Sequence, residues 1–229
     1  MLCLTLLVVA LFARLGTWQL SRAQEKIDMQ GAADSASEQP LLTELQSIDE
    51  SVLYRRVMLS GRYDFSRQFL RDNRLHNRQP GYEVLTPFFP DNDASRAILV
   101  NRGWLPQGVN RADTPDVAAG AYAALDSVTG LIVTPSKGFT LGEAVEPGAS
   151  DWPMVIQYID YETISNKLDK IAVMPAVIVL APGQSEGYTR IWQPVANGPE
   201  KHYGYAFQWF AMMLAVIVLF IYLNFLKKK

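Results

Sequence analysis

Hydrophobic residues gather in two long runs at the ends of the chain, and the segment between them alternates between apolar and polar positions. From Tyr203 to Leu226 no residue is charged, and the run 211–223 is almost wholly apolar. A helix of about 20 such residues crosses the ~30 Å hydrocarbon core of a bilayer. The pattern therefore predicts a transmembrane helix over residues 202–226.

The first apolar run is shorter and carries one charge. Residues 1–13 are apolar, Arg14 interrupts them, and the run continues to about residue 20. No basic residue precedes it, and 10–13 is a poor cleavage site, so we expect a retained transmembrane helix over 1–20 rather than a cleaved signal peptide, which is the alternative. The missing basic residues also lead us to expect that the natural start lies upstream or is very short.

Between the two runs we predict one domain, residues 21–201, whose first part, 21–40, is a flexible lead-in because 32–40 is small and polar. Strand patterns follow, most of them short and bounded by Gly, Pro, Asn or Asp. A helix is predicted over 161–170, with Asp160 as its N-cap. The predicted fold class is mainly β with some α: an antiparallel β-barrel-like or sandwich domain, flanked by two transmembrane α-helices. The predicted strands are 52–60, 68–72, 82–89, 97–101, 128–134, 154–159, 176–180 and 188–193.

The charges at the end of the chain predict its orientation. Lys227, Lys228 and Lys229 follow the second span directly, and such clusters mark the cytoplasmic side. We therefore expect residues 227–229 to form a cytoplasmic tail. With two spans, both termini are then cytoplasmic and the central domain is periplasmic, which makes this a multi-pass protein of a bacterial inner membrane.

Composition and missing motifs exclude several functions. The net charge is −2 and the folded region has no Lys/Arg-rich block, so no nucleic-acid partner is expected. The single cysteine, Cys3, precludes an intramolecular disulfide, and with two histidines it does not make a four-ligand zinc site. The chain also lacks the nucleophile-elbow, phosphate-loop, zinc-protease and haem-attachment motifs. A nucleophile, a general base and a metal site are therefore all unsupported by the sequence motifs.

Two clusters of residues carry candidate binding chemistry. Trp18, Arg22 and Lys26 are spaced by four and so share one helical face at the outer end of the first span, where they form either a binding surface or an ordinary interfacial belt. Arg74 and Arg102 each follow an asparagine on neighbouring predicted strands. Their guanidinium groups could bind ligand carboxylates or could instead satisfy turn carbonyls.

A third cluster lies where the domain meets the second span. His202 stands at the helix entrance, and Tyr205, Ala206 and Trp209 follow at three, four and seven residues, on the same predicted face. Such an imidazole either serves as an axial ligand of a haem or simply extends to the membrane interface. Gln19 and Gln208 lie near the outer ends of the two spans and are predicted to hydrogen-bond across them.

Several separated motifs occur in an order that resembles the surfeit locus protein 1 family, the assembly factors of cytochrome c oxidase, in its bacterial branch. The resemblance covers the full length. The motifs are Gly16-x-Trp18-Gln19, Asp72-Asn73-Arg74, Gly81-Tyr82-x-Val84-x-Thr86-Pro87, Val100-Asn101-Arg102-Gly103-Trp104-x-Pro106 and Pro199-x-x-His202-x-x-Tyr205-Ala206-x-Gln208-Trp209-Phe210.

The resemblance implies a non-enzymatic role in loading haem a into the catalytic subunit of the oxidase. His202 corresponds to the family histidine implicated in haem binding and would be the axial ligand of the haem iron, with Glu200 as one acceptor for its other nitrogen. The expected partners are that catalytic subunit, haem a synthase as a second candidate, and the lipid bilayer. Trp209 would pack against the macrocycle, and Arg22, Arg74 or Arg102 could pair with the propionates. Tyr205 and Trp18 complete the predicted cofactor-binding set.

Two other functions stay open. A membrane-anchored scaffold could bind the oxidase subunit or haem a synthase without binding haem. An anchored sensor is the other, although a cytoplasmic tail of three lysines provides no signalling domain.

Overall fold

The computed structural model describes residues 2–108, 114–117, 126–135, 142–145, 151–194 and 198–226. By contacts it divides into two compact units. The helix unit comprises residues 1–32 and 193–229, and the barrel unit comprises residues 33–192. The predicted cytoplasmic tail, 227–229, lies outside the described residues.

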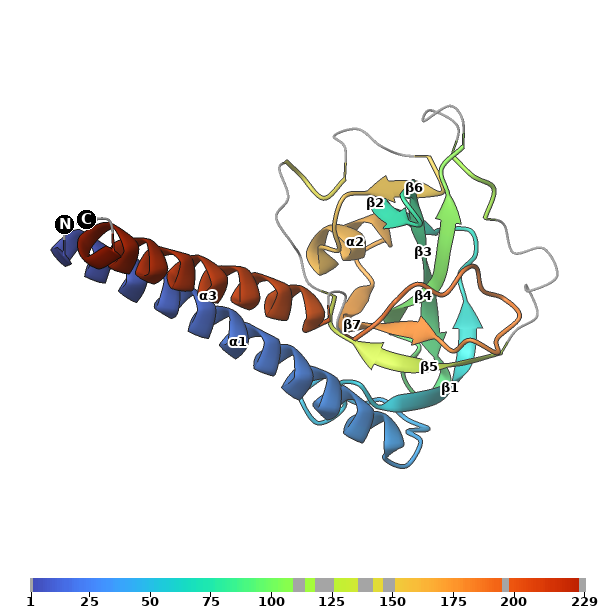
Figure 1. The fold of residues 1–229 in the computed structure, drawn as a ribbon. Coiled ribbons are helices and arrows are strands. Elements are labelled where there is room, and N and C mark those ends of the chain that lie inside the picture. The colour runs from blue at the N-terminus through green and yellow to red at the C-terminus, as the bar shows by residue number, and fades with distance from the viewer. Residues whose placement is uncertain are drawn as a thin grey trace. The chain divides into compact units, whose positions relative to one another are not determined.

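Seven strands form one sheet in the barrel unit (Figure 1). Five of them close into a barrel in the order β1-β5-β7-β4-β3, because β3 also pairs with β1, and β2 and β6 continue the sheet beyond β3. Closure decides between the two predicted architectures in favour of the barrel. The strands are β1 (Arg56–Tyr63), β2 (Phe69–His76), β3 (Gln79–Pro90), β4 (Arg96–Pro106), β5 (Ser127–Val133), β6 (Met154–Ile156) and β7 (Ala172–Leu180).

The prediction of a wholly antiparallel sheet is wrong at two strand pairs. β4 pairs with β7 and β2 pairs with β6 in parallel, whereas the other pairs are antiparallel. A parallel pair needs a long crossover, and the chain between β4 and β7 supplies one that includes α2 (Tyr161–Lys167). The predicted strand over 188–193 is also wrong, because it contributes only an isolated bridge between Thr189 and Trp104.

The predicted helix is confirmed with an earlier end. Asp160 caps it, since its carboxylate accepts a hydrogen bond from the Thr163 backbone N–H at 2.8 Å. Ile164 and Leu168 are buried in the core beneath the sheet. The helix ends at Lys167 because the chain turns into the left-handed region at Asp169 and Lys170, with φ of 58° and 64°.

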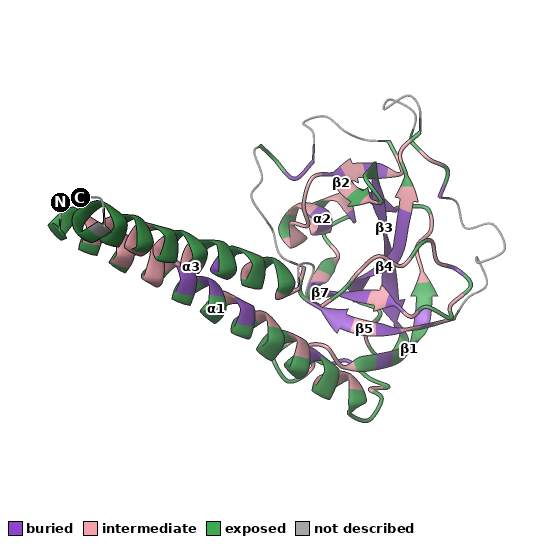
Figure 2. Ribbon diagram, in the orientation of Figure 1, coloured by how far each residue is buried: buried purple, intermediate pink, exposed green. Residues whose placement is uncertain are grey.

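Alternation along the strands builds the barrel interior. In β1 the residues at 57, 59 and 61 are buried while their neighbours are exposed, the period of two expected for a strand with one buried face (Figure 2). The long strands β3 and β4 are buried at almost every position because elements pack on both of their faces. The main core joins residues from β1, β3, β4, β5 and β7: Val57, Leu59, Phe88, Ile98, Val100, Val128, Ile132, Ala176, Ile178 and Leu180.

Two long helices make up most of the helix unit: α1 (Leu2–Glu38) and α3 (Glu200–Ile221), which continues as the short π-helix η3 (Tyr222–Leu226). The predicted flexible lead-in over 21–40 is therefore wrong, since α1 stays helical to Glu38. Its alanines favour helix, and Ala33 is buried. In the barrel unit, Arg56 Nε donates to Ser37 O at 2.8 Å, which holds the end of α1.

The two helices pack antiparallel, with residues 2 and 226 at the same end of the pair (Figure 1). Positions of lower exposure recur with spacings of four and three, at 9, 12, 16, 19 and 23 in α1 and at 202, 206, 209, 213 and 216 in α3. This is the seam of an antiparallel coiled coil.

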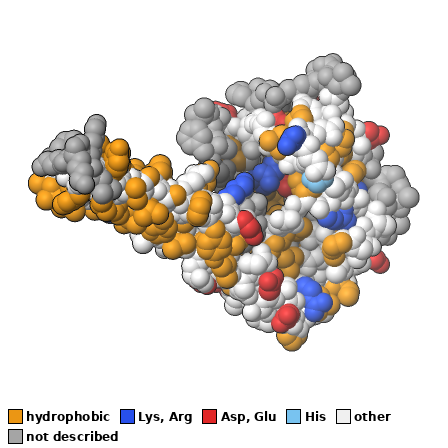
Figure 3. Space-filling view, viewed as in Figure 1, with side chains coloured by type: hydrophobic (Ala, Val, Ile, Leu, Met, Phe, Trp, Pro, Cys, Tyr) orange, Lys and Arg blue, Asp and Glu red, His pale blue; other side chains and the backbone are white. Residues whose placement is uncertain are grey.

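Both helices expose many large apolar side chains. Figure 3 shows them along the face of the helix pair that is turned to the viewer. Both helices are long and apolar enough to cross a membrane, which agrees with the two predicted spans. The most exposed of these side chains are Leu2, Leu4, Leu6, Leu7, Phe207, Leu214, Val218, Leu219 and Phe225.

Candidate functional site

His202 lies in the first turn of α3, on the face that meets α1. Its Nδ1 lies 2.8 Å from Oε1 of Gln19, which stands on the facing helix. Gln19 is only 9% exposed, and His202 is half-buried. An amide buried between apolar helices needs a hydrogen-bond partner, and the imidazole supplies it. This contact fixes the position of the ring.

The contact determines which ring nitrogen is available. If the amide NH₂ faced Nδ1, the proton would sit on Nε2; a carbonyl oxygen accepts only, so Oε1 facing Nδ1 matches the tautomer with its proton on Nδ1 and its lone pair on Nε2. Nε2 can then bind a metal, as an imidazole does in a haem protein. Within the described ranges, no three His, Cys, Asp or Glu side chains gather to hold a metal ion. His202 would therefore act through a single bond to a metal that arrives with its own ligands.

Small and aromatic residues pack beneath His202 along the seam. Ala206, one turn further on, is buried. Trp209 packs on Phe12 of α1, with ring centroids 5.6 Å apart. The predicted face below His202 is therefore present, but Trp209 is engaged with the other helix, and Tyr205 does not share the seam because it is 52% exposed on the outward side.

The remaining predicted residues of the helix unit lie outside the seam or at its margin. Trp18 is 53% exposed. Arg22 forms an ion pair with Glu25, one turn further along α1. The predicted bond between Gln19 and Gln208 is wrong: Gln19 bonds His202 instead, and Gln208 is exposed. Gln19 was not among the predicted binding residues, although its place three residues after the small Gly16, on a repeating seam, marks it as facing the partner helix.

Arg102, predicted to bind propionates, is buried inside the barrel unit. It is 1% exposed, its Nε donates to Glu186 O at 2.7 Å and its NH1 donates to Gln68 Oε1 at 2.9 Å. The aromatic rings of Phe65 and Tyr188 lie about 5 Å from its guanidinium carbon. The guanidinium group of Arg102 is therefore buried within the barrel unit and is not exposed to bind a ligand carboxylate.

Arg74 is more accessible and belongs to a charged cluster. A bulge in β2 brings Arg71 and Arg74 to the same partner, the buried carboxylate of Glu83 on β3. Arg71 NH1 lies 3.3 Å and Arg74 Nε 3.2 Å from Glu83 Oε2. Burial lowers the pKa of the Arg71 guanidinium, and Glu83 opposes that shift. The side chain of Arg74 is 37% exposed, which leaves part of it open to solvent.

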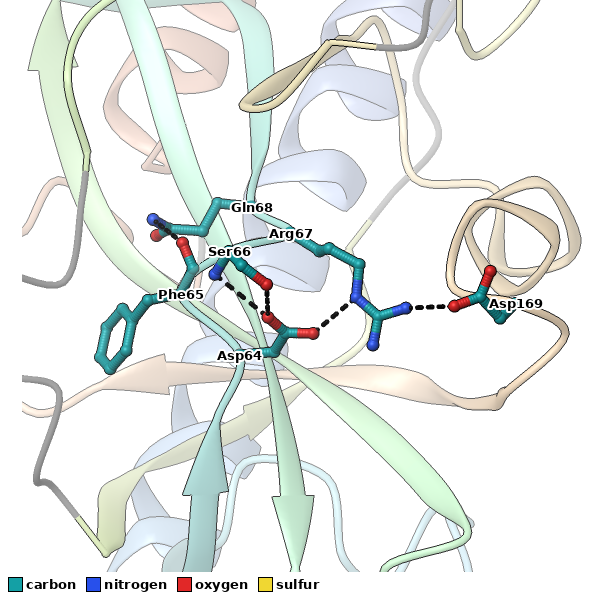
Figure 4. Close-up of polar contacts among 6 residues, drawn as sticks. All are labelled: Asp64, Phe65, Ser66, Arg67, Gln68 and Asp169. Carbon is teal, nitrogen blue, oxygen red and sulfur yellow. Dashed lines mark hydrogen bonds and ion pairs between the residues drawn. The ribbon is translucent and has the colours of Figure 1, made fainter.

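A second polar cluster was not predicted. Arg67 bridges two carboxylates, with Nε 2.6 Å from Asp64 and NH1 2.8 Å from Asp169 (Figure 4). These three residues line an open cavity of about 660 Å³. Asp64 also accepts hydrogen bonds from the Ser66 backbone and hydroxyl. Each carboxylate faces the positively charged Arg67, so the cluster links the turn after β1 to the turn after α2. Asp169 is 102 residues from Arg67 in sequence, and local patterns do not reveal this pairing.

The chain combines a closed five-stranded barrel with two helices long and apolar enough to cross a membrane, and a histidine lies at the seam of those helices. The model of the SURF1 family matches residues 6–214, and the chain belongs to that family.

Individual relatives are more distant. A SURF1-like protein of Rickettsia prowazekii is 24% identical over 225 residues, which cover 95% of this chain and 87% of the relative. Surfeit locus protein 1 of Takifugu rubripes is 32% identical over 48% of this chain, and the cytochrome oxidase assembly protein SHY1 of Saccharomyces cerevisiae is 28% identical over 41%. The matched segments span 52% of the fish protein and 25% of the yeast protein.

Proposed function

We propose that this chain is a non-enzymatic assembly factor for cytochrome c oxidase, and that it carries haem a on His202 before the haem enters the catalytic subunit. Membership of the SURF1 family and the name of the yeast relative support the oxidase part of the proposal. The arrangement of His202 supports the haem part.

The observation that carries the haem proposal is that the two nitrogens of the His202 imidazole have different roles. Nδ1 is committed to Gln19 Oε1 at 2.8 Å, and Nε2 keeps the lone pair that a haem iron binds. The site is at the start of an apolar helix and is partly exposed, so a large planar ligand can reach it without opening the protein core. Haem a is the cargo and supplies the iron; the chain supplies one positioned nitrogen.

Other residues fit supporting roles to different degrees. Arg22 and Arg74 are both partly exposed, and their guanidinium groups could pair with carboxylates such as the haem propionates. Trp18 and Tyr205 present exposed aromatic rings on the helix pair. Trp209 would have to leave Phe12 before it could stack on a macrocycle.

The orientation in the membrane is part of the proposal. Because the two helices are antiparallel and each can span a bilayer, the ends of the pair at residues 2 and 226 share one side. The lysines at 227–229 favour the cytoplasm for that side. The barrel unit is then periplasmic and His202 lies near the outer face of the bacterial inner membrane.

A scaffold that binds the oxidase subunit or haem a synthase without haem is the competing function. It is favoured by the internal bonds of Arg102 and by the packing of Trp209 on Phe12, which leave both occupied within the protein. The two functions differ in one observable, the presence of bound haem.

An absorption spectrum of the full chain, purified from a strain that makes haem a, tests the proposal. We expect a stoichiometric Soret band that His202→Ala abolishes or shifts. His76→Ala is the matched control, since His76 is the only other histidine and packs on Trp104 in the barrel unit, with ring centroids 5.1 Å apart. A colourless wild-type protein, or an unchanged spectrum in His202→Ala, would favour the scaffold.

A further inference from the structure

Gln19 is the one polar side chain that the described helix seam buries against a titratable partner. Gln19 is 9% exposed, and its Oε1 lies 2.8 Å from His202 Nδ1 across the two helices. Small residues stand beside it, with Gly16 one turn before and Ala23 one turn after, both buried. The helices can approach closely here, so the contact is short and direct.

We propose that Gln19 is a positioning residue that fixes the tautomer and the direction of the His202 ring, so that Nε2 is the nitrogen presented to a ligand. Free imidazole side chains exchange between two neutral tautomers, and the partner of one nitrogen determines where the proton stays. The relevance of this role to haem rests on the function proposed above. The role itself concerns the protein without haem.

Ring geometry adds a direction. Nδ1 and Nε2 lie on different sides of the five-membered ring, so a ring whose Nδ1 points at α1 turns Nε2 away from α1. A ligand bound by Nε2 therefore approaches from outside the helix pair rather than from between the two helices. The seam itself has no room for a macrocycle, because a Cβ on Gly16 would already lie 2.6 Å from the ring of Phe210.

The alternative arrangement is chemically distinct. If the Gln19 amide were turned over, its NH₂ would donate to Nδ1, the proton would sit on Nε2, and Nε2 would have no lone pair for a metal. The two arrangements have the same heavy-atom distance but opposite tautomers. A measurement of the tautomer therefore decides between them.

Nitrogen-15 NMR of the full chain in lipid nanodiscs, with labelled histidine, makes that measurement without haem. His76→Gln leaves a single labelled ring, since the chain has two histidines. We expect protonated Nδ1 and unprotonated Nε2 in this background, and a shift toward protonated Nε2 after Gln19→Leu. Gln208→Leu is the matched control, because it removes an exposed glutamine from the same helix pair and should leave the tautomer unchanged. Protonated Nε2 in the parent protein, or no change in Gln19→Leu, overturns the proposal.

Titration with hemin, the ferric haem b, links the tautomer to binding. We expect Gln19→Leu to weaken binding about 10- to 100-fold, as loss of an outer hydrogen bond to a metal ligand does. Gln19→Glu should restore affinity and lower the midpoint potential, because a carboxylate acceptor makes the imidazole more basic. Unaltered affinity and potential in both variants would contradict the positioning role. If the parent protein shows the expected tautomer yet binds neither hemin nor haem a, the proposed haem function fails and the positioning of the ring stands.

Discussion

The ring of Phe210 occupies the space that a side chain at Gly16 would need. A Cβ built on Gly16 would lie 2.6 Å from Cζ of Phe210, well inside van der Waals contact. Glycine therefore allows α1 and α3 to approach at this point, one turn from the Gln19–His202 hydrogen bond. The close approach of the two helices at Gly16 therefore also determines where His202 lies relative to Gln19.

Gly16→Ala is predicted to destabilise the helix pair, although alanine favours helix over glycine by about 1 kcal/mol. Overpacking of this kind costs about 1–3 kcal/mol. The control is Gly204→Ala in α3, where no atom lies within 4 Å of an added Cβ and where the substitution should stabilise. Thermal unfolding of the full chain in detergent measures both. Equal effects of the two substitutions would show that the helices do not meet at Gly16.

Glu83→Gln is predicted to be among the most destabilising single changes in the barrel unit. The carboxylate is 1% exposed and faces both Arg71 and Arg74. Removing its charge breaks the ion pair with the largely buried Arg71, and breaking a buried pair costs about 3–5 kcal/mol. Denaturation of the full chain, followed by tryptophan fluorescence, measures the free energy of unfolding.

Arg74→Gln is the control for this ion pair. Arg74 is 37% exposed, and its loss leaves Glu83 paired with Arg71, so the expected cost is below about 1 kcal/mol. Similar costs for Glu83→Gln and Arg74→Gln would mean that burial does not govern the strength of this cluster.

Local patterns predicted most strands, but not the pairing between them. The alternation in 52–60 and the cap at Asp160 are local signals, and the structure bears out the strand and the helix start. The parallel pairing of β4 with β7 depends on contacts between residues about 75 positions apart, which no local pattern reports. The helix from 21 to 38 was missed because its Ser and Asp residues resemble a linker, while buried Ala33 supplies packing that composition does not show.

The positions of the predicted site residues depended on helix register and on contacts within the barrel unit, which local patterns report only in part. His202 was predicted from its place at the helix entrance, and the seam beneath it is present. Which glutamine faces it depended on the register of two helices, and the spacing of Gly16, Gln19 and Ala23 by three and four residues carries that register. Arg102 was predicted to bind a ligand carboxylate because its sequence neighbours do not reveal its hydrogen bonds to Gln68 and Glu186.

Acid is predicted to unfold the barrel unit partly through a recurring turn. In Asp49-x-Ser51, Asp64-x-Ser66 and Asp93-x-Ser95, the carboxylate accepts hydrogen bonds from the serine backbone N–H and hydroxyl, and the pKa of each aspartate lies below its ordinary value of 3.8. At Asp64, burial raises the pKa, but the hydrogen bonds from Ser66 and Arg67 lower it by more.

The sign of the pH dependence follows from those lowered pKa values. The unfolded chain takes up protons first as the pH falls, so the stabilisation is complete above about pH 4 and is lost as the pH drops toward the folded pKa. Asp64→Asn should lower stability at pH 7 and flatten its loss below pH 4. Asp91→Asn, which removes an exposed carboxylate outside the turns, is the control. Parallel stability curves for the wild type and Asp64→Asn between pH 2 and pH 7 would contradict the role of this turn.

Reporter fusions are predicted to place the barrel unit outside the cytoplasm. α1 and α3 are antiparallel, so residue 226 and the start of α3 at Glu200 lie at opposite ends of the pair, and the lysines at 227–229 favour the cytoplasm for the end at residue 226. Alkaline phosphatase, which is active only in the periplasm, should be active when fused after Gln107, at the end of β4, and inactive when fused after Lys229. Green fluorescent protein fluoresces when it stays in the cytoplasm but not when it is exported unfolded. It should therefore give the reverse pattern, which controls for expression. Phosphatase activity at Lys229 together with fluorescence at Gln107 would invert the proposed orientation and would move His202 to the cytoplasmic face.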